Sequence, residues 1–204
     1  ALLGRDVHLI SAVGSDFYGE TLLEQTRQAG VNVSSCIRLH GHNTSTYLSI
    51  ANQQEETVLA INDTHILQQL TPQLLNGSRD LIRHSGVVLA DCNLTAEAIE
   101  WVFTIADDIP VFIDTVSEFK AEKMKTWFTR IHTLKPTQKE LAILWGQPIH
   151  TDADRVLAVN SLHQQGVKRI FVCLEDESVF CSEKDGEQFL LTPPEHTVVD
   201  SLDR

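Results

Sequence analysis

Residues 111–146 constrain the fold more than any other stretch, because two strand patterns alternate there with two helix patterns. The apolar run at 111–113 ends in Asp114, and a second short run at 132–134 ends at Lys135. A helix pattern follows each run. In open α/β sheets, ligands bind beyond the carboxyl ends of the parallel strands. The sequence therefore predicts an α/β fold in which Asp114 and Lys135 lie at the edge where ligands bind.

The start of the second helix has a local explanation that needs no ligand. Thr137 follows Pro136 and precedes Glu140 by three residues, which is the spacing of a capping box. In that motif the threonine hydroxyl and the glutamate carboxylate each accept a backbone N–H. On spacing alone we favour this structural role for both residues over a ligand contact.

The same alternation continues along the chain. Each predicted strand is short and apolar, and the helices carry apolar residues at helical spacing. Further strands are predicted at 7–13, 86–91 and 169–174, and further helices at 14–30, from Thr71 onward, at 96–106 and at 152–165, with the end of another helix before Gly4. This alternation predicts a mostly parallel sheet with helices on both faces.

Two segments instead have the period of two that is typical of antiparallel strands. Residues 33–62 form short alternating runs separated by turns near 41–43 and 52–55. They predict a small sheet that lies off the main one. Two later runs flank Asp185-Gly186 and predict a β-hairpin.

Length and composition limit the classes of protein to consider. A chain of 204 residues with 42% hydrophobic residues is long enough for one sizeable core, so one domain is expected. The net charge of −12 argues against a surface that holds DNA or RNA. No apolar run is long enough for a transmembrane helix, and no secretion signal opens the chain.

The cysteines predict neither a zinc site nor a disulfide framework. None of the four forms a C-x-x-C pair or has a histidine at metal spacing. Their positions are Cys36, Cys92, Cys173 and Cys181. Reduced thiols in a cytoplasmic protein are the interpretation that fits best.

Several strings together resemble the ribokinase (PfkB-type) family of sugar and nucleoside kinases. The strings are SAVGSDFYGE, NTSTYLS, AINDTHI, VVLADCN and IHTLKP, and they are most similar to the pseudouridine-kinase branch or to an unassigned sugar kinase near it. The resemblance implies a three-layer ribokinase-like fold with a mostly parallel central sheet and a small β lid at about 33–62. It also implies ATP and Mg²⁺ as cofactors and a sugar or nucleoside as substrate.

The resemblance assigns roles to particular residues. It implies substrate contacts from Thr44, Ser45, Thr46 and Asn93, contacts to ATP or its phosphates from Asp114, Lys135, Thr137, Glu140, Cys173 and Glu175, and a role for Glu140 in placing Mg²⁺. In the V-G-x-D-x-x-G signature, we expect Asp16 to cap a helix and the glycines to shape a turn.

The sequence departs from the family pattern in two motifs. Thr137 stands where the family usually has asparagine. Glu175 and Ser178 replace both glycines of a T-L-G-x-x-G turn beside the adenine site. Glu175 would bring negative charge toward a nucleotide.

The resemblance covers nearly all 204 residues but includes neither end of the active site. Val198, Val199 and Asp200 match the approach to the family's second signature, V-V-D-T-T-G-A-G-D, and no glycine-rich turn or catalytic aspartate follows them. We therefore expect residues 1–204 to be a partial kinase domain, incomplete at both termini, and assign no catalytic residue. The expected base lies beyond the end of the chain.

The kinase domain described above has two main alternatives. The chain is either this kinase domain, a non-catalytic module that binds a nucleoside or sugar, or an inactive remnant of a kinase. A dehydrogenase ranks last, because no G-x-G-x-x-G follows the first strand. The lid hairpins either pair between two subunits, giving a homodimer, or cover their own site.

Overall fold

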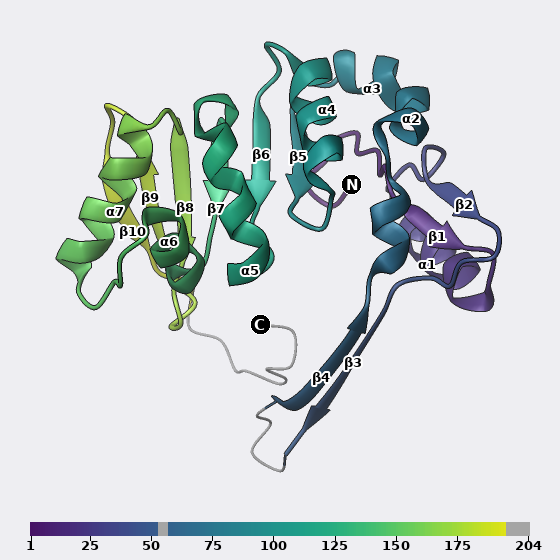
Figure 1. Cartoon of the computed structure of the whole chain (residues 1–204), viewed down its shortest axis with the longest axis horizontal. Coiled ribbons are helices and arrows are strands. Elements are labelled where there is room, and N and C mark those ends of the chain that lie inside the picture. Colours follow the sequence, from purple (N-terminus) through teal and green to yellow (C-terminus); the bar gives the residue numbers. More distant parts are fainter. Residues whose placement is uncertain (53–56, 195–204) are drawn as a thin grey trace. The chain divides into compact units, whose positions relative to one another are not determined.

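The computed structural model describes residues 1–52 and 57–194, which fall into two compact units (Figure 1). The described part of the first unit is 1–52 with 57–78, and the second unit is Arg79–Pro194. That the chain forms one domain stays a prediction. The turn predicted at 52–55 lies mostly outside the described residues, and the string at 195–204 lies wholly outside them.

The first unit begins with a βαβ element. Strand β1 (Ala12–Gly14) pairs in parallel with β2 (Ile37–Leu39), and α1 (Phe17–Gln28) connects them. Val13, Leu23 and Val33 form the small core between these elements. A parallel pair needs such a crossover, and the helix buries its apolar side against the two strands.

Three predictions for this unit need correction. The residues before Gly4 form a turn, with a hydrogen bond from Gly4 N to Ala1 O, and not the end of a helix. The strand predicted at 7–13 is shorter, because Val7 and Leu9 are partly exposed and only 12–14 form a continuous ladder. Residues 37–39 pair with β1 and not with the lid, because the α1 crossover places them beside β1.

The lid is a two-stranded antiparallel ribbon. Strand β3 (Thr46–Ala51) pairs with β4 (Thr57–Asp63), with Thr46 opposite Asp63 (Figure 1). The predicted small sheet off the main one is thus confirmed for these two strands. Three short helices complete the unit: η1 (His65–Gln69), α2 (Pro72–Leu75) and η2 (Asn76–Ser78).

The second unit is built on a six-stranded sheet. The strand order is β10-β9-β8-β7-β6-β5, in which the strands from β5 to β8 are parallel and the last two are antiparallel. Their bounds are β5 Val88–Asp91, β6 Val111–Asp114, β7 Thr133–Lys135, β8 Arg169–Cys173, β9 Val179–Glu183 and β10 Gln188–Leu191. The mostly parallel sheet and the C-terminal hairpin are both confirmed.

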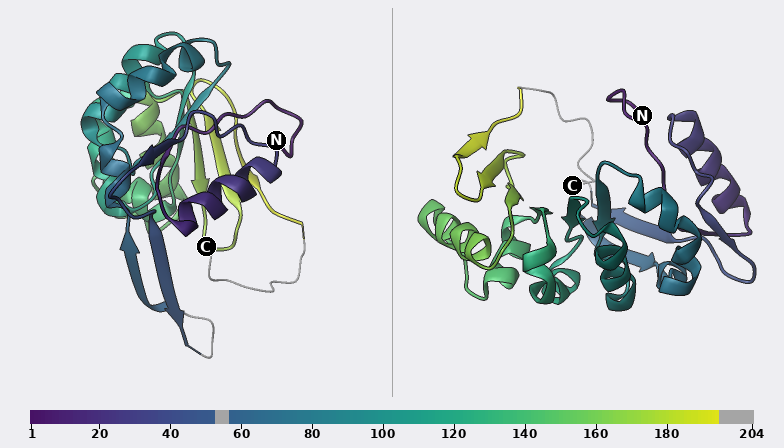
Figure 2. Two further views of the ribbon diagram at one scale, coloured as in Figure 1. Left: turned by 90° about the vertical axis from the view of Figure 1, so that its right-hand side faces the viewer. Right: turned by 90° about the horizontal axis from the view of Figure 1, so that it is seen from above.

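The helices of this unit lie on one face of its sheet (Figure 2). They are α3 Arg79–Arg83, α4 Ala96–Ala106, α5 Glu118–Ala121, η3 Glu122–Arg130, α6 Gln138–Trp145 and α7 Asp152–Gln164. Ile113, Leu134 and Ile170 are fully buried beneath them, whereas Leu89 is 73% exposed on the opposite face.

This arrangement corrects the expectation of helices on both faces for the residues of the unit. Parallel crossovers are right-handed, and here the strand order advances in one direction from β5 to β8. Every crossover therefore places its helix on the same side.

In the described part of the chain, no helix is long and apolar enough to cross a membrane.

Candidate functional site

The carboxyl ends of the parallel strands bring four predicted residues together. The strand register places Asp91 opposite Asp114, and Asp114 opposite Lys135. A single parallel bridge then joins Thr137 to Cys173, with Cys173 N donating to Pro136 O at 2.9 Å. Neighbouring strands that end at one level produce this grouping. The candidate site therefore lies at the edge that the sequence predicted.

Asp114 and Lys135 form an ion pair at this edge. Lys135 Nζ lies 3.0 Å from Asp114 Oδ2. Burial alone would lower the pKa of Lys135, but the hydrogen bond and the charge of Asp114 outweigh it, so the net pKa is raised. The ammonium therefore stays charged at neutral pH and is a fixed cation at the end of β7.

The loop after Asp114 holds a strained residue. Val116 has a φ of +65°, a left-handed value that a β-branched residue rarely adopts. Its N–H donates to Asp114 Oδ1 at 3.0 Å, and Ser117 N donates to Thr115 O at 2.7 Å across it. Such strain costs about 1 to 3 kcal/mol and is common next to functional groups.

The predicted capping box is present at the start of α6. Thr137 N donates to Glu140 Oε2 at 2.7 Å, and Glu140 N donates to Thr137 Oγ1 at 3.3 Å. The structural role that the spacing favoured is thus confirmed for both residues. It fixes the carboxylate of Glu140, a residue that is only 6% exposed, at the carboxyl edge of the sheet.

A buried threonine that sequence reasoning missed completes this arrangement. Thr115 is fully buried, and its Oγ1 lies 2.6 Å from Glu140 Oε2 and 3.2 Å from Lys135 O. A hydroxyl has one hydrogen, and the shorter contact to a carboxylate receives it. The only sequence signal was the position of Thr115 directly after a strand that ends in a carboxylate.

The carboxylate of Glu140 is suited to Mg²⁺. Oε2 is occupied by two donors, while Oε1 accepts no hydrogen bond from the residues that the structure describes. Within those residues no group of three or more His, Cys, Asp or Glu could hold a metal ion. Mg²⁺ in phosphoryl-transfer sites is held by one or two carboxylates, water and the phosphates, so a single oriented carboxylate fits it.

The turn after β8 differs from a glycine-rich turn in its surface charge. Leu174 N donates to Ser178 O at 2.9 Å, and Glu177 N donates to Leu174 O at 3.2 Å, which closes the turn tightly. The Glu175 side chain is 91% exposed and lies 3.9 Å from Lys139 Nζ. Its charge therefore faces solvent and is screened there.

Asn93 lies in the loop between β5 and α4. Its backbone N–H donates to Asp91 Oδ1 at 2.8 Å, and its side-chain oxygen accepts from Lys120 Nζ at 2.5 Å. The loop is also bonded to Lys123. Neither lysine was singled out from the sequence, because both partners are distant in the chain.

In the first unit, the glycine signature forms a hydrogen-bonded turn. Asp16 Oδ1 accepts from Gly19 N at 2.8 Å and from Thr44 Oγ1 at 2.6 Å, and Oδ2 accepts from Thr44 N at 2.7 Å. Thr44 Oγ1 in turn accepts from Gly14 N at 3.0 Å. The bonds from Thr44 and then from Gly19 hold the pKa of Asp16 below its ordinary value. The expected capping role of Asp16 is confirmed.

The three lid residues with predicted substrate contacts differ in their surroundings. Thr44 is 5% exposed, and its hydroxyl is used by the Asp16 turn. Thr46 Oγ1 donates to Thr44 O at 3.2 Å. Ser45 Oγ is buried and has no partner among the described residues, which makes it the one hydroxyl of the three that is not bonded. Their contacts with a substrate stay predictions.

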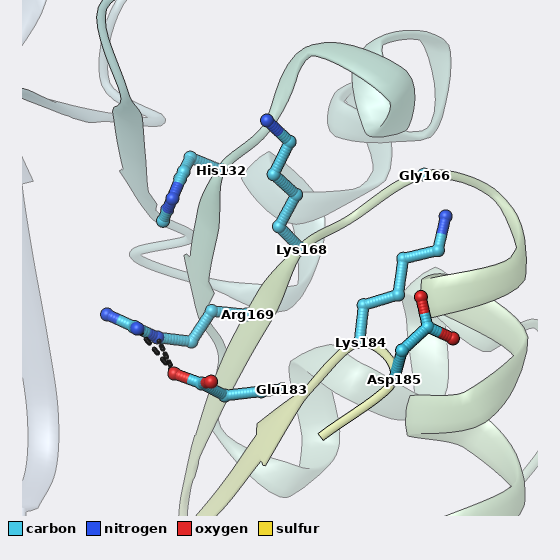
Figure 3. A pocket seen from close by; sticks show the side chains of 7 residues that line it. All are labelled: His132, Gly166, Lys168, Arg169, Glu183, Lys184 and Asp185. Carbon is cyan, nitrogen blue, oxygen red and sulfur yellow. Dashed lines mark hydrogen bonds and ion pairs between the residues drawn. The ribbon is translucent and has the colours of Figure 1, made fainter.

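A cavity of about 420 Å³ lies at the opposite end of the strands (Figure 3). It is lined by His132, Gly166, Lys168, Arg169, Glu183, Lys184 and Asp185. His132 and Lys168 directly precede β7 and β8, so the cavity lies at their amino ends. Burial, and then the charges of Lys168 and Arg169, lower the pKa of His132. None of the predicted site residues lines this cavity, and ligands of such sheets bind at the other end.

Comparison with known proteins identifies the family. Residues 1–202 match the model of the pfkB family carbohydrate kinases, so the chain belongs to this family. It is 76% identical over 202 residues to the uncharacterised sugar kinase YeiI of Escherichia coli (strain K12). It is 38% identical over 199 residues to the pseudouridine kinase of the same organism. These matches cover 99% and 98% of this chain, and 56% and 64% of the two relatives.

Solved structures show the same fold. A carbohydrate kinase from Agrobacterium tumefaciens matches 94% of this chain and 61% of its own, with a TM-score of 0.77 and 26% identity. A ribokinase of Arabidopsis thaliana, solved with ribose and ATP, matches 92% of this chain and 61% of its own, with a TM-score of 0.80 and 18% identity. The ribokinase-like α/β fold is thus confirmed.

Proposed function

We propose that the chain is part of a kinase domain whose intact form transfers the γ-phosphoryl group of ATP to a primary hydroxyl of a ribose-bearing substrate such as pseudouridine. Membership of the carbohydrate kinase family and the 38% identity to a pseudouridine kinase support this class of reaction and substrate. The oriented Glu140 carboxylate carries the proposal, because it stands at the motif position that the family uses for Mg²⁺.

The residues at the edge of the sheet suit phosphoryl transfer. Such catalysis consists mainly of positioning and of neutralising charge on the phosphates. Lys135 supplies a fixed cation, and its partner Asp114 holds the ammonium in place. Glu140 offers Oε1 to the water shell of Mg²⁺, which would neutralise phosphate charge when bound. Thr115 and Thr137 hold the carboxylate for that contact.

Substrate recognition is assigned to other elements. Asn93 lies at the carboxyl end of β5, and Ser45 and Thr46 lie at the start of the lid. The unbonded hydroxyl of Ser45 is the strongest of the lid candidates, because a buried hydroxyl without a partner costs about 1 to 3 kcal/mol, which a substrate oxygen would offset.

Thermal unfolding of the 204-residue chain with Mg-ATP or with pseudouridine tests the proposal. A ligand at about 100 times its Kd adds roughly 2.7 kcal/mol, which raises the midpoint by about 5 to 10 °C in a chain of this size. Glu140→Gln should keep the capping box yet reduce the shift caused by Mg-ATP. Glu97→Gln, in the first turn of α4, serves as the control. A midpoint that neither ligand moves would refute the proposal for this chain.

Turnover by the chain alone should be very slow. The sequence contains no glycine-rich turn followed by an aspartate that could act as general base. Loss of those parts should cost many orders of magnitude in rate. Phosphorylation of pseudouridine by these 204 residues at an ordinary enzymatic rate would contradict this expectation.

A non-catalytic binding module is the second candidate. Glu175 and Ser178 stand where the resembling family has the two glycines of its T-L-G-x-x-G turn, and the loss of both glycines favours a module that binds without ATP. Pseudouridine that raises the midpoint while Mg-ATP does not would favour the binding module over the kinase part.

We also infer that the lid pairs between two copies of the chain. A two-stranded ribbon is marginally stable in isolation. Here it exposes six large apolar side chains: Tyr47, Leu48, Ile50, Val58, Leu59 and Ile61. By the strand register, Leu48, Ile50, Leu59 and Ile61 lie on one face of the ribbon, and a second lid packed on that face would cover these four. Light scattering should give a dimer mass, and replacing Ile50 and Ile61 by lysine should give a monomer. A monomeric parent chain would instead mean that each lid covers its own site.

A further inference from the structure

Two lysines hold the loop that follows β5. Lys120, in α5, donates to Asn93 Oδ1 at 2.5 Å. Lys123, one helical turn later, donates to Cys92 O at 2.7 Å and to Leu94 O at 2.5 Å. Three consecutive residues of the loop are thus each bonded to an ammonium group. All of these residues belong to the unit Arg79–Pro194.

The two lysines differ in how many N–H groups they have left for a ligand. Lys123 is half-buried and uses two of its three N–H groups on backbone carbonyls, and burial lowers its pKa. It is therefore a positioning residue for the loop. Lys120 uses one N–H on Asn93, which leaves two for a ligand.

The hydrogen bond from Lys120 also determines which end of the Asn93 amide is left for a ligand. An ammonium group only donates, so it must face the amide oxygen of Asn93. The amide NH₂ group then points away from Lys120 and supplies two further donors. Of the neighbouring carboxylates, Asp91 accepts from Asn93 N, and Asp114 is paired with Lys135.

We propose that Lys120 and Asn93 form a donor subsite for an acceptor-only oxygen of the substrate, and that Lys120 sets the class of substrate. This proposal rests on the proposed function. A sugar hydroxyl donates as well as accepts, so a subsite of donors leaves its hydrogen without a partner. A carbonyl or carboxylate oxygen has no such hydrogen. Nucleosides present such an oxygen through the carbonyl groups of the base, and sugar acids present one through the carboxylate; these are the two classes that the subsite is proposed to take.

Calorimetric titration of the 204-residue chain separates these classes. The three probes are pseudouridine, ribonate and ribose, which share a five-carbon polyol and differ in the acceptor oxygen. We expect pseudouridine or ribonate to bind at least about tenfold more tightly than ribose, since a hydrogen bond to a charged group is worth about a factor of ten or more. Pseudouridine as the tighter ligand assigns the base carbonyl, and ribonate as the tighter ligand assigns the carboxylate.

Variants of Lys120 test its role directly. Lys120→Met should weaken the preferred ligand about 10- to 100-fold and change ribose binding less than about threefold. Lys120→Arg should recover part of the affinity. Lys125→Met is the matched control, because Lys125 lies on η3 and pairs with exposed Glu122. Asn93→Asp replaces donors by a carboxylate and should abolish ribonate binding.

The outcomes separate failure of the subsite from failure of the proposed function. If Lys120→Met weakens all three ligands equally, Lys120 only positions the loop, and the subsite is wrong while the proposed function stands. If ribose binds as tightly as the other two probes, the subsite is likewise wrong and the proposed function stands. If none of the three binds the parent chain, both the subsite and the proposed function are overturned.

Discussion

The hydroxyl of Thr115 lies 2.6 Å from a carboxylate oxygen of Glu140, a residue 25 positions further along the chain. One residue follows β6 and the other lies in the first turn of α6. Their contact joins two successive crossovers of the sheet. It also leaves the second oxygen of Glu140 oriented for a ligand.

Replacing this hydroxyl should destabilise the second unit. Thr115→Val keeps the shape of the side chain and removes the donor, so the Glu140 carboxylate loses a buried partner. We expect the free energy of unfolding to fall by about 1 to 3 kcal/mol and the midpoint by about 2 to 4 °C for each kcal/mol. Thr104→Val, which removes an exposed hydroxyl bonded to Glu100 O, is the control. Equal midpoints for Thr115→Val and the parent chain would show that the contact carries no stability.

The turn around Asp16 should make the stability of the first unit depend on pH. The pKa of Asp16 is lowered by its bonds to Thr44 and Gly19. A lowered folded-state pKa adds stability above the unfolded value of about 3.9, and this stability is lost as the pH falls through the folded value. Asp16→Asn should therefore be less stable than the parent chain at pH 7, and the difference should shrink toward pH 3.

Unfolding curves at several pH values between 7 and 3 measure this difference. Asp185→Asn, in the turn between β9 and β10, is the control, because asparagine suits the left-handed φ of +60° there. A difference between Asp16→Asn and the parent chain that stays constant down to pH 3 would rule out the linkage.

The same turn cannot accommodate a side chain at Gly19. A Cβ atom there would lie 2.4 Å from Gly14 O and 2.8 Å from Thr44 Oγ1. Gly19→Ala should therefore lower the free energy of unfolding by about 1 to 3 kcal/mol, the usual cost of overpacking. Gly77→Ala meets no atom within 4 Å and should change stability by less than about 0.5 kcal/mol. Chemical denaturation compares the two variants, and similar midpoints would count against the close approach.

Local signals account for what the sequence predicted correctly. The capping box of Thr137 and Glu140 and the turn at Asp185-Gly186 depend on residues a few positions apart. The carboxyl edge followed from the strand patterns, because the residues that follow parallel strands in an open α/β sheet lie at the edge where ligands bind. These features can be predicted without knowing which strands pair.

Long-range pairing accounts for what the sequence did not predict. Residues 37–39 have the same alternation as the lid strands, so the pattern alone did not show that they pair with β1. Thr115 and Lys120 contact partners 25 and 27 positions away, and no spacing rule connects them. The placement of the helices on one face depends on strand order, which is a property of the whole sheet.

The reactivity of the cysteines should report on the site. Burial raises the pKa of Cys92 to about 12, against a smaller opposing effect of Lys123, so its thiol is unreactive at neutral pH. Cys173 is half-buried beside Thr137. Mass spectrometry after iodoacetamide treatment should show Cys173 labelled well before Cys92, and Mg-ATP should slow the labelling of Cys173. Half-buried Cys36, in the other unit, is the internal control. Labelling of Cys173 that Mg-ATP leaves unchanged would argue against a nucleotide at this edge.

Restoring asparagine at position 137 should improve binding of Mg-ATP without changing stability. Asparagine caps helices as well as threonine does, so Thr137→Asn should change the free energy of unfolding by less than about 0.5 kcal/mol. Its amide NH₂ group has two donors where the threonine hydroxyl has one. One additional hydrogen bond to a phosphate should tighten Mg-ATP about tenfold. Thr151→Asn is the matched control, because Thr151 forms an equivalent capping box with Asp154 at the start of α7. Calorimetric titration with Mg-ATP measures both variants. Equal affinities in Thr137→Asn and Thr151→Asn would mean that position 137 does not face the phosphates, and Glu140 would then have only its structural role.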